Sequence, residues 1–115
     1  MEGGHHLLQL NNNEILLTKR QATYYLSMSY RVFGDLHVTN QRTIFAPKWL
    51  RNKKGDYIEV LNNEIKNVET FNSFRYVPDG LKITLHSNQE YKFKLFDREH
   101  ILEKYRINIV ATLQK

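Results

Sequence analysis

The residues from Phe33 to Pro47 read Phe-Gly-Asp-Leu-His-Val-Thr-Asn-Gln-Arg-Thr-Ile-Phe-Ala-Pro, and this stretch decides the fold. Two short strand patterns flank Asn40 and Gln41. Asn tolerates a positive φ better than most residues, so the stretch predicts a hairpin with a tight two-residue loop.

The two-residue loop also fixes which residues of the hairpin face each other. It places Leu36 opposite Phe45 and, two residues nearer the loop, Val38 opposite Thr43. Leu36, Val38 and Phe45 then share one face, which we expect to be buried. The other face, which we expect to meet water, carries Asp35, His37 and Arg42.

The composition fits one folded, non-secreted domain. The chain has 115 residues, of which 41% are hydrophobic and 12% aromatic. It has no Cys, which excludes a disulfide framework, a thiolate metal site and a Cys nucleophile. No apolar run has the length of a membrane span, and the first residues lack the features of a signal peptide. We therefore expect a cytoplasmic protein.

The charge favours anionic partners. Seventeen Lys and Arg residues against twelve Asp and Glu residues give a net charge of +5 and a pI near 9.5. Such a surplus attracts nucleic acid, acidic proteins or anionic lipids, and it is equally compatible with a basic protein that binds none of them.

Further strands and turns can be placed along the chain. We expect residues 1–13 to form a loose lead and residues 14–115 to form the domain. Strands are predicted at about 21–27, 57–61 and 68–74, with turns at Asn62-Asn63 and at Pro78-Asp79-Gly80.

Two alternating segments predict a second hairpin. Leu81, Ile83 and Leu85 alternate with polar residues, as do Tyr91, Phe93 and Leu95. Both sets face one core only if the loop has an odd number of residues. We expect Leu85 opposite Tyr91, across the loop Ser87-Asn88-Gln89, with Asn88 or Gln89 in the left-handed region.

After Asp97 the spacing of apolar residues changes from that of a strand to that of a helix. Asp97 is a favourable helix N-cap, and Glu99 follows in the first turn. Leu102, Tyr105 and Ile109 recur at helical spacing, near Ile101 and Leu113. About seven strands followed by one helix would leave open edges in a flat sheet. The pattern therefore predicts a mainly β fold: a pleckstrin-homology-like barrel of two near-orthogonal antiparallel sheets, capped by one C-terminal α-helix.

The stretch Gly34-Asp35-Leu36-His37-Val38-Thr39-Asn40-Gln41-Arg42-Thr43-Ile44-Phe45 resembles the signature of GRAM domains, a branch of the pleckstrin-homology-like superfamily. Segments 58–60, 64–69, 78–83 and 90–93 resemble later strands of that family, so the resemblance runs from about residue 14 to residue 105. The chain looks most like the small stand-alone bacterial versions. Larger eukaryotic relatives often bind lipids or proteins, so the resemblance implies a non-catalytic interaction module.

A basic loop is the strongest candidate binding site. Four cations stand within residues 48–54, around the only Trp of the chain. Trp can enter the interfacial layer of a bilayer while cations meet anionic headgroups. By resemblance, this loop joins the third and fourth strands at an open end of the barrel, beside Arg31. The predicted lipid- or anion-binding residues are Arg31, Lys48, Trp49, Arg51, Lys53 and Lys54.

Other interpretations of the same residues stay open. In a purely structural one, Trp49 packs on the barrel and the lysines form a solvated rim. The alternative function is a protein-interaction or self-assembly module, in which a sheet edge or the Tyr24-Tyr25 region pairs with another chain, so that a homo-oligomer could form. Under the lipid hypothesis the protein would sit peripherally at the inner membrane surface.

Catalysis, cofactors and nucleic acid are not expected. The five His residues show no metal-ligand spacing, and we find no phosphate loop, nucleophile motif or nucleic-acid-binding motif. Asp35 and His37 share a strand face and could form a local pair. For Arg42 we favour a structural role, in which its guanidinium binds a nearby acid such as Glu64 or Glu69, over an anion contact.

Overall fold

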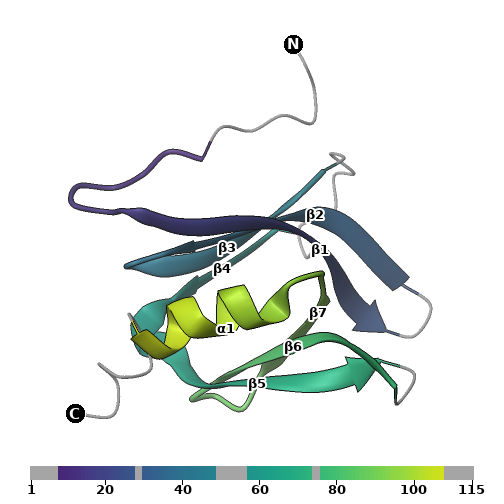
Figure 1. The fold of residues 1–115 in the computed structure, drawn as a ribbon. Helices are drawn as coiled ribbons and strands as arrows, with labels where there is room; N and C mark the ends of the chain where they lie inside the picture. The colour runs from purple at the N-terminus through teal and green to yellow at the C-terminus, as the bar shows by residue number, and fades with distance from the viewer. Residues whose placement is uncertain (1–7, 28–29, 49–56, 74–75, 108–115) are drawn as a thin grey trace.

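A computed structural model of the protein describes residues 8–27, 30–48, 57–73 and 76–107. The described residues form seven β-strands, one 3-10 helix and one α-helix (Figure 1). Their bounds are β1 Leu16–Ser27, β2 Tyr30–Thr39, β3 Arg42–Pro47, β4 Ile58–Leu61, η2 Asn62–Glu64, β5 Ile65–Ser73, β6 Val77–Leu85, β7 Glu90–Lys94 and α1 Arg98–Tyr105.

The strands form one antiparallel sheet in the order β4-β3-β2-β1-β7-β6-β5. Figure 1 shows the sheet folded into two layers, one made by β1–β4 and the other by β5–β7, with α1 lying across the open side between them. The long strand β1 makes the corner, since it pairs with β2 along most of its length and with β7 only over Thr23–Tyr25. The predicted fold class is confirmed, and hydrogen bonding continues through β1 from one layer to the other.

The β2–β3 hairpin has the predicted register. Leu36 pairs with Phe45 and Val38 pairs with Thr43. Leu36, Val38 and Phe45 are fully buried together in the core. Gly34, opposite Pro47, is required by close packing, because a Cβ atom there would lie 2.3 Å from the carbonyl oxygen of Ala46.

The other face of this hairpin is not exposed, contrary to the prediction. His37 and Arg42 are only 6% and 8% exposed, and Ile44 beside them is fully buried. The segment before β1 reaches this face, because Arg42 donates hydrogen bonds to the carbonyl oxygen of Gln9 and to the carboxylate of Glu14. The alternation of the strand predicts which residues share a face but not what covers that face.

The turn predicted at Pro78-Asp79-Gly80 is wrong, because these residues belong to β6. Phe71 pairs with Gly80, and two residues later Ser73 pairs with Val77, which is three residues from Gly80. The strand β6 therefore carries one extra residue at this point, which makes a β-bulge. Pro78 is tolerated at such a bulge, where the ladder is interrupted. Gly80 leaves room for the Phe71 ring, which a Cβ atom would approach to 2.6 Å.

The β6–β7 hairpin has the predicted parity with a shifted register. Ile83, rather than Leu85, pairs with Tyr91, so the two alternating sets still share one face. The amide of Leu85 donates to the carbonyl oxygen of Gln89, which leaves three loop residues at 86–88. Asn88 takes the left-handed conformation, with φ of 74°.

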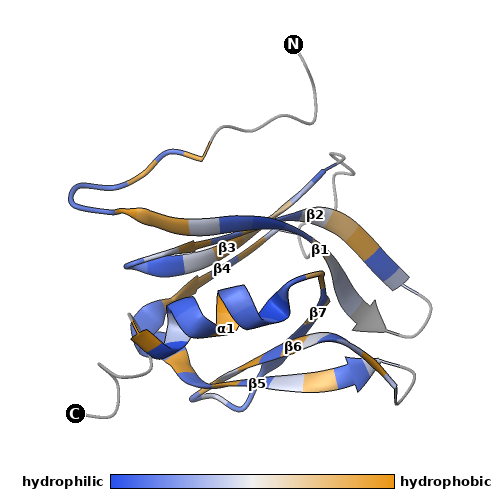
Figure 2. Ribbon diagram, viewed as in Figure 1, coloured by the Kyte–Doolittle hydropathy of each residue, from blue (hydrophilic) through white to orange (hydrophobic). Residues whose placement is uncertain are grey.

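The helix α1 follows Asp97, as predicted, but Asp97 makes no side-chain cap hydrogen bond and has φ of 59°. Figure 2 shows α1 as a largely hydrophilic helix, and its buried residues are Ile101, Leu102 and Tyr105. Ile109 and Leu113 lie outside the described residues.

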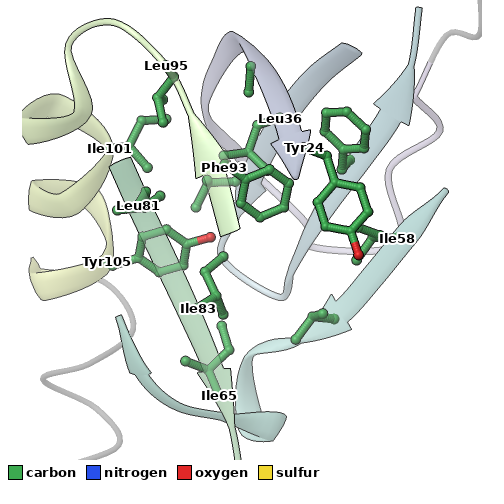
Figure 3. Packing of buried hydrophobic residues seen from close by; sticks show 14 of the residues in the cluster. Tyr24, Leu36, Ile58, Ile65, Leu81, Ile83, Phe93, Leu95, Ile101 and Tyr105 are labelled. Carbon is green, nitrogen blue, oxygen red and sulfur yellow. The ribbon is translucent and has the colours of Figure 1, made fainter. Parts of the chain in front are cut away.

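The core is built around aromatic rings. Tyr24, Phe45 and Phe93 contact one another with centroid separations of 5.4–5.7 Å. The Tyr105 side chain enters the same core from α1 (Figure 3), and its hydroxyl shares a hydrogen bond of 2.5 Å with the Thr43 hydroxyl. Burial raises the pKa of Tyr105. The helix is thus fixed to the β2–β3 hairpin by apolar packing and one buried polar contact.

Candidate functional site

An open groove of about 630 Å³ lies at the corner of the sheet, where β1 meets β2 and β7. Its walls come from the second half of β1, the first half of β2, the residue after β3, the start of β6, the end of β7 and the segment that leads into α1. The lining residues are Gln21, Ala22, Thr23, Tyr25, Arg31, Phe33, Gly34, Lys48, Asp79, Lys94, Leu95 and Phe96.

The strand register explains why cations and an aromatic ring meet in this groove. Thr23 of β1 pairs with Lys94 on one side and with Phe33 on the other. Directly paired residues lie on the same face of a sheet, so Lys94 and Phe33 project on the same side. The amide of Lys48 donates to the carbonyl oxygen of Phe33, which places Lys48 next in the row.

Arg31 lies one step along the same face. It pairs with Tyr25, and its guanidinium carbon is 5.3 Å from the centre of the Tyr25 ring. This cation–π contact holds the exposed guanidinium beside the groove. The predicted binding residues Arg31 and Lys48 therefore both neighbour Phe33, Arg31 along β2 and Lys48 across from it.

Two aromatic rings of the groove are unusually exposed. The exposed fractions are 62% for Phe33 and 92% for Phe96. Reasoning from the sequence missed both, although the signal was present: Phe33 has the opposite parity to Leu36 in one strand, and Leu95 and Phe96 are neighbours. Leu95 faces the core, whereas Phe96, in the turn before α1, faces outward.

One carboxylate also lines the groove. Asp79 is 8% exposed and contacts Lys94, with 3.5 Å between the Lys94 Nζ and Asp79 Oδ2 atoms. Its Oδ1 atom has no hydrogen-bond partner among the described residues. Asp79 offsets the charge of Lys94, so the positive charge of the groove comes mainly from the side that holds Arg31 and Lys48.

The other residues predicted for the basic loop, Trp49, Arg51, Lys53 and Lys54, lie outside the described residues. The Tyr24-Tyr25 region, predicted as an alternative pairing surface, divides between core and groove. Tyr24 is 5% exposed and packs in the core, whereas Tyr25 forms part of the groove wall.

Arg42 has the structural role that we favoured, with different partners. Its Nε and Nη2 atoms donate to the two carboxylate oxygens of Glu14 at 2.8 and 3.0 Å, and its Nη1 atom donates to Glu59 at 3.2 Å. The predicted partners Glu64 and Glu69 were wrong, because the segment before β1 supplies the main acid. Thr39 completes the site, since its hydroxyl donates to Glu14 at 2.6 Å.

This pair is buried, with 10% of the Arg42 side chain and none of the Glu14 side chain exposed. The hydrogen bonds from Arg42 are the main cause that lowers the pKa of Glu14 from 4.5 to about 2, and the bonds from Thr39 and the Asn11 amide act in the same direction. The hydrogen bonds to Glu14 raise the pKa of Arg42 in turn. Thr39 and Arg42 of the hairpin signature thus bind the carboxylate of Glu14.

Asp35 and His37 share a strand face without forming the predicted pair. The carboxylate of Asp35 lies 4.0 Å from the Lys19 ammonium. The His37 Nδ1 atom has no hydrogen-bond partner among the described residues, and burial is the main cause that lowers the pKa of His37.

Comparisons with known proteins agree with this fold. The C-terminal domain of an unknown protein from Leishmania infantum superposes with a TM-score of 0.72 at 16% identity, covering 86% of this chain and 87% of that one. The Vps36 N-terminal PH domain superposes with a TM-score of 0.65 at 15% identity, covering 98% of this chain and 90% of that one. No curated protein matches the sequence significantly.

Both structures are too distant in sequence to show more than a shared pleckstrin-homology-like fold. The family model of the GRAM domain, by contrast, matches residues 4–114, almost the whole sequence. The chain therefore belongs to the GRAM domain family.

Proposed function

We propose that this GRAM domain is a non-catalytic module that binds an anionic membrane surface through the face that carries the groove. GRAM and pleckstrin-homology-like domains are interaction modules for lipids or proteins. The proposed contact surface consists of Arg31 and Lys48 together with the loop residues Trp49, Arg51, Lys53 and Lys54.

The observation that carries this proposal is the placement of Arg31 and Lys48 beside the same exposed ring, Phe33. Lys48 is also the first cation of the basic loop, so the chain continues directly from this position into the loop. A Lys or Arg near an anionic leaflet contributes about 1 kcal/mol, so several of them acting together give measurable binding that salt weakens.

We further propose that the protein works in the cytoplasm and associates peripherally with the inner membrane surface. Within the described ranges, the structure contains no helix with the length and hydrophobicity of a membrane span. Binding by a charged surface is reversible, and it depends on the anionic lipid content of the leaflet.

Sedimentation with lipid vesicles tests the proposal. The full chain should bind vesicles of phosphatidylcholine with phosphatidylglycerol, bind pure phosphatidylcholine weakly, and dissociate as salt rises. The double variant Arg31→Glu/Lys48→Glu should lose most of this binding. The matched control Lys66→Glu/Arg106→Glu changes two other exposed cations by the same total charge and should bind much more strongly than the groove variant.

The basic loop is tested separately by Trp49→Ala and by Lys53→Glu/Lys54→Glu, both of which should weaken binding. Equal losses in the groove variant and in its matched control would show that net charge alone drives binding, and would contradict the assigned surface. If the wild-type chain binds no anionic vesicle, the membrane proposal is wrong and a protein-interaction or self-assembly module takes its place.

A further inference from the structure

We infer that Phe33 and Phe96 form an apolar anchor that inserts into the bilayer interface between the cations of the groove. This inference rests on the proposed function and adds the way in which the domain sits on the membrane. Of the basic loop, only its first residue, Lys48, takes part in this arrangement.

The first argument is exposure combined with position. Phe96 is 92% exposed and Phe33 is 62% exposed, and both line the groove. Phe33 lies on β2 and Phe96 lies in the turn between β7 and α1, so the two rings reach the groove from opposite sides of β1. Two large exposed rings that line one groove can enter the same patch of a bilayer interface.

The second argument is the charge around the rings, which selects a bilayer over an apolar protein surface. Arg31 and Lys48 lie beside Phe33 in the groove. Aromatic rings favour the headgroup level of a bilayer, and long cationic side chains can lie on apolar material while their charges reach anionic headgroups. An apolar protein partner would have to take the charges of Arg31 and Lys48 out of water.

The third argument is that nearby acids are engaged with cations. Asp97, which follows Phe96, lies 3.8 Å from the Arg20 guanidinium. Asp79 contacts Lys94 in the groove, as described above. The repulsion that a carboxylate beside Phe96 would exert on an anionic surface is therefore reduced by paired cations.

Phe96→Ala, Phe33→Ala and the double variant test the anchor in the vesicle assay. Because both rings are exposed, the variants should keep the fold, which circular dichroism verifies. Each single variant loses the favourable free energy of transferring one ring from water into the bilayer interface. This loss should weaken binding to vesicles with phosphatidylglycerol about tenfold. Tyr76→Ala removes another highly exposed ring, 83% exposed and not part of the groove lining, and should leave affinity nearly unchanged.

A fluorescent probe distinguishes insertion from a general loss of affinity. Phe96→Trp in a Trp49→Phe background places the only Trp at the anchor. Its emission should move to shorter wavelength when anionic vesicles are added, whereas Tyr76→Trp in the same background should not respond.

The tenfold loss together with the emission shift at position 96 supports the anchor. If the alanine variants bind normally, or if the Trp at position 96 stays in water, the anchor is refuted. Binding that still depends on Arg31 and Lys48 in that case leaves the proposed function intact. Absence of any vesicle binding by the wild-type chain refutes both.

Discussion

Replacing Arg42 with methionine should destabilise the domain by about 3–5 kcal/mol, because the change leaves the carboxylate of Glu14 buried without its main partner. The Glu14 side chain has no exposed surface and receives two hydrogen bonds from Arg42. Methionine keeps much of the length of the arginine stem, so the loss reports mainly on charge and hydrogen bonding.

A double-mutant cycle isolates the pair. Glu14→Leu alone should cost a similar amount, while Arg42→Met/Glu14→Leu should cost clearly less than the sum of the two, since no unpaired buried charge remains. The control is Lys19→Met, which breaks the ion pair of Lys19 with Asp35 at 4.0 Å, where the Lys19 side chain is 55% exposed. That change should cost less than about 1 kcal/mol.

Urea denaturation followed by circular dichroism gives the free energy of unfolding of each variant. If Arg42→Met costs no more than Lys19→Met, or if the two single changes are additive, the segment before β1 is not held by this pair. Thr39 and Arg42 would then not stabilise the fold by binding Glu14.

Three further stability predictions follow from the described contacts. The pKa of Glu14 in the folded protein is about 2, against 4.5 ordinarily. Its stabilising effect is therefore complete above about pH 4.5 and is lost as pH falls toward 2. Urea midpoints measured from pH 6 to pH 2 should show a smaller acid loss in Glu14→Gln than in the wild type, and equal losses would contradict this. Gly34→Ala should cost at least about 2 kcal/mol, because its Cβ atom would lie 2.3 Å from the Ala46 carbonyl oxygen. A wild-type melting temperature for this variant would show that the two strands can separate without penalty. Tyr105→Phe should cost about 1–3 kcal/mol, because the buried Thr43 hydroxyl loses its partner. A change below about 0.5 kcal/mol in urea denaturation would mean that this hydrogen bond does not contribute to the fold.

Local patterns in the sequence were enough to predict much of the fold. The alternation of Leu36 and Val38, with a two-residue loop, was enough to predict their pairing with Phe45 and Thr43. Parity also predicted an odd loop with Asn88 or Gln89 in the left-handed region, and Asn88 takes that conformation, but the loop comprises residues 86–88 rather than 87–89. Ile83 and Leu85 have the same parity, so either can oppose Tyr91 without turning an apolar residue outward.

What the sequence did not reveal depends on contacts between distant segments. Arg42 and Glu14 are 28 residues apart, and no local pattern shows that the segment before β1 lies over the hairpin. The sequence around Gly80 likewise has the composition of a turn, but these residues lie in β6, where Gly80 packs against the distant residue Phe71. The groove combines residues of β1, β2, β6 and β7, so only the three-dimensional fold brings Phe96 into the same groove as Arg31 and Lys48.

The binding face can be mapped directly by nuclear magnetic resonance of the isotope-labelled full chain, titrated with bicelles that contain phosphatidylglycerol. The account predicts that signals of Arg31, Phe33, Lys48 and Phe96 shift or broaden first, while those of the outer strand β5 change little. Changes centred on β5, or an unaltered spectrum at saturating anionic lipid, would contradict the assignment of this face to the membrane.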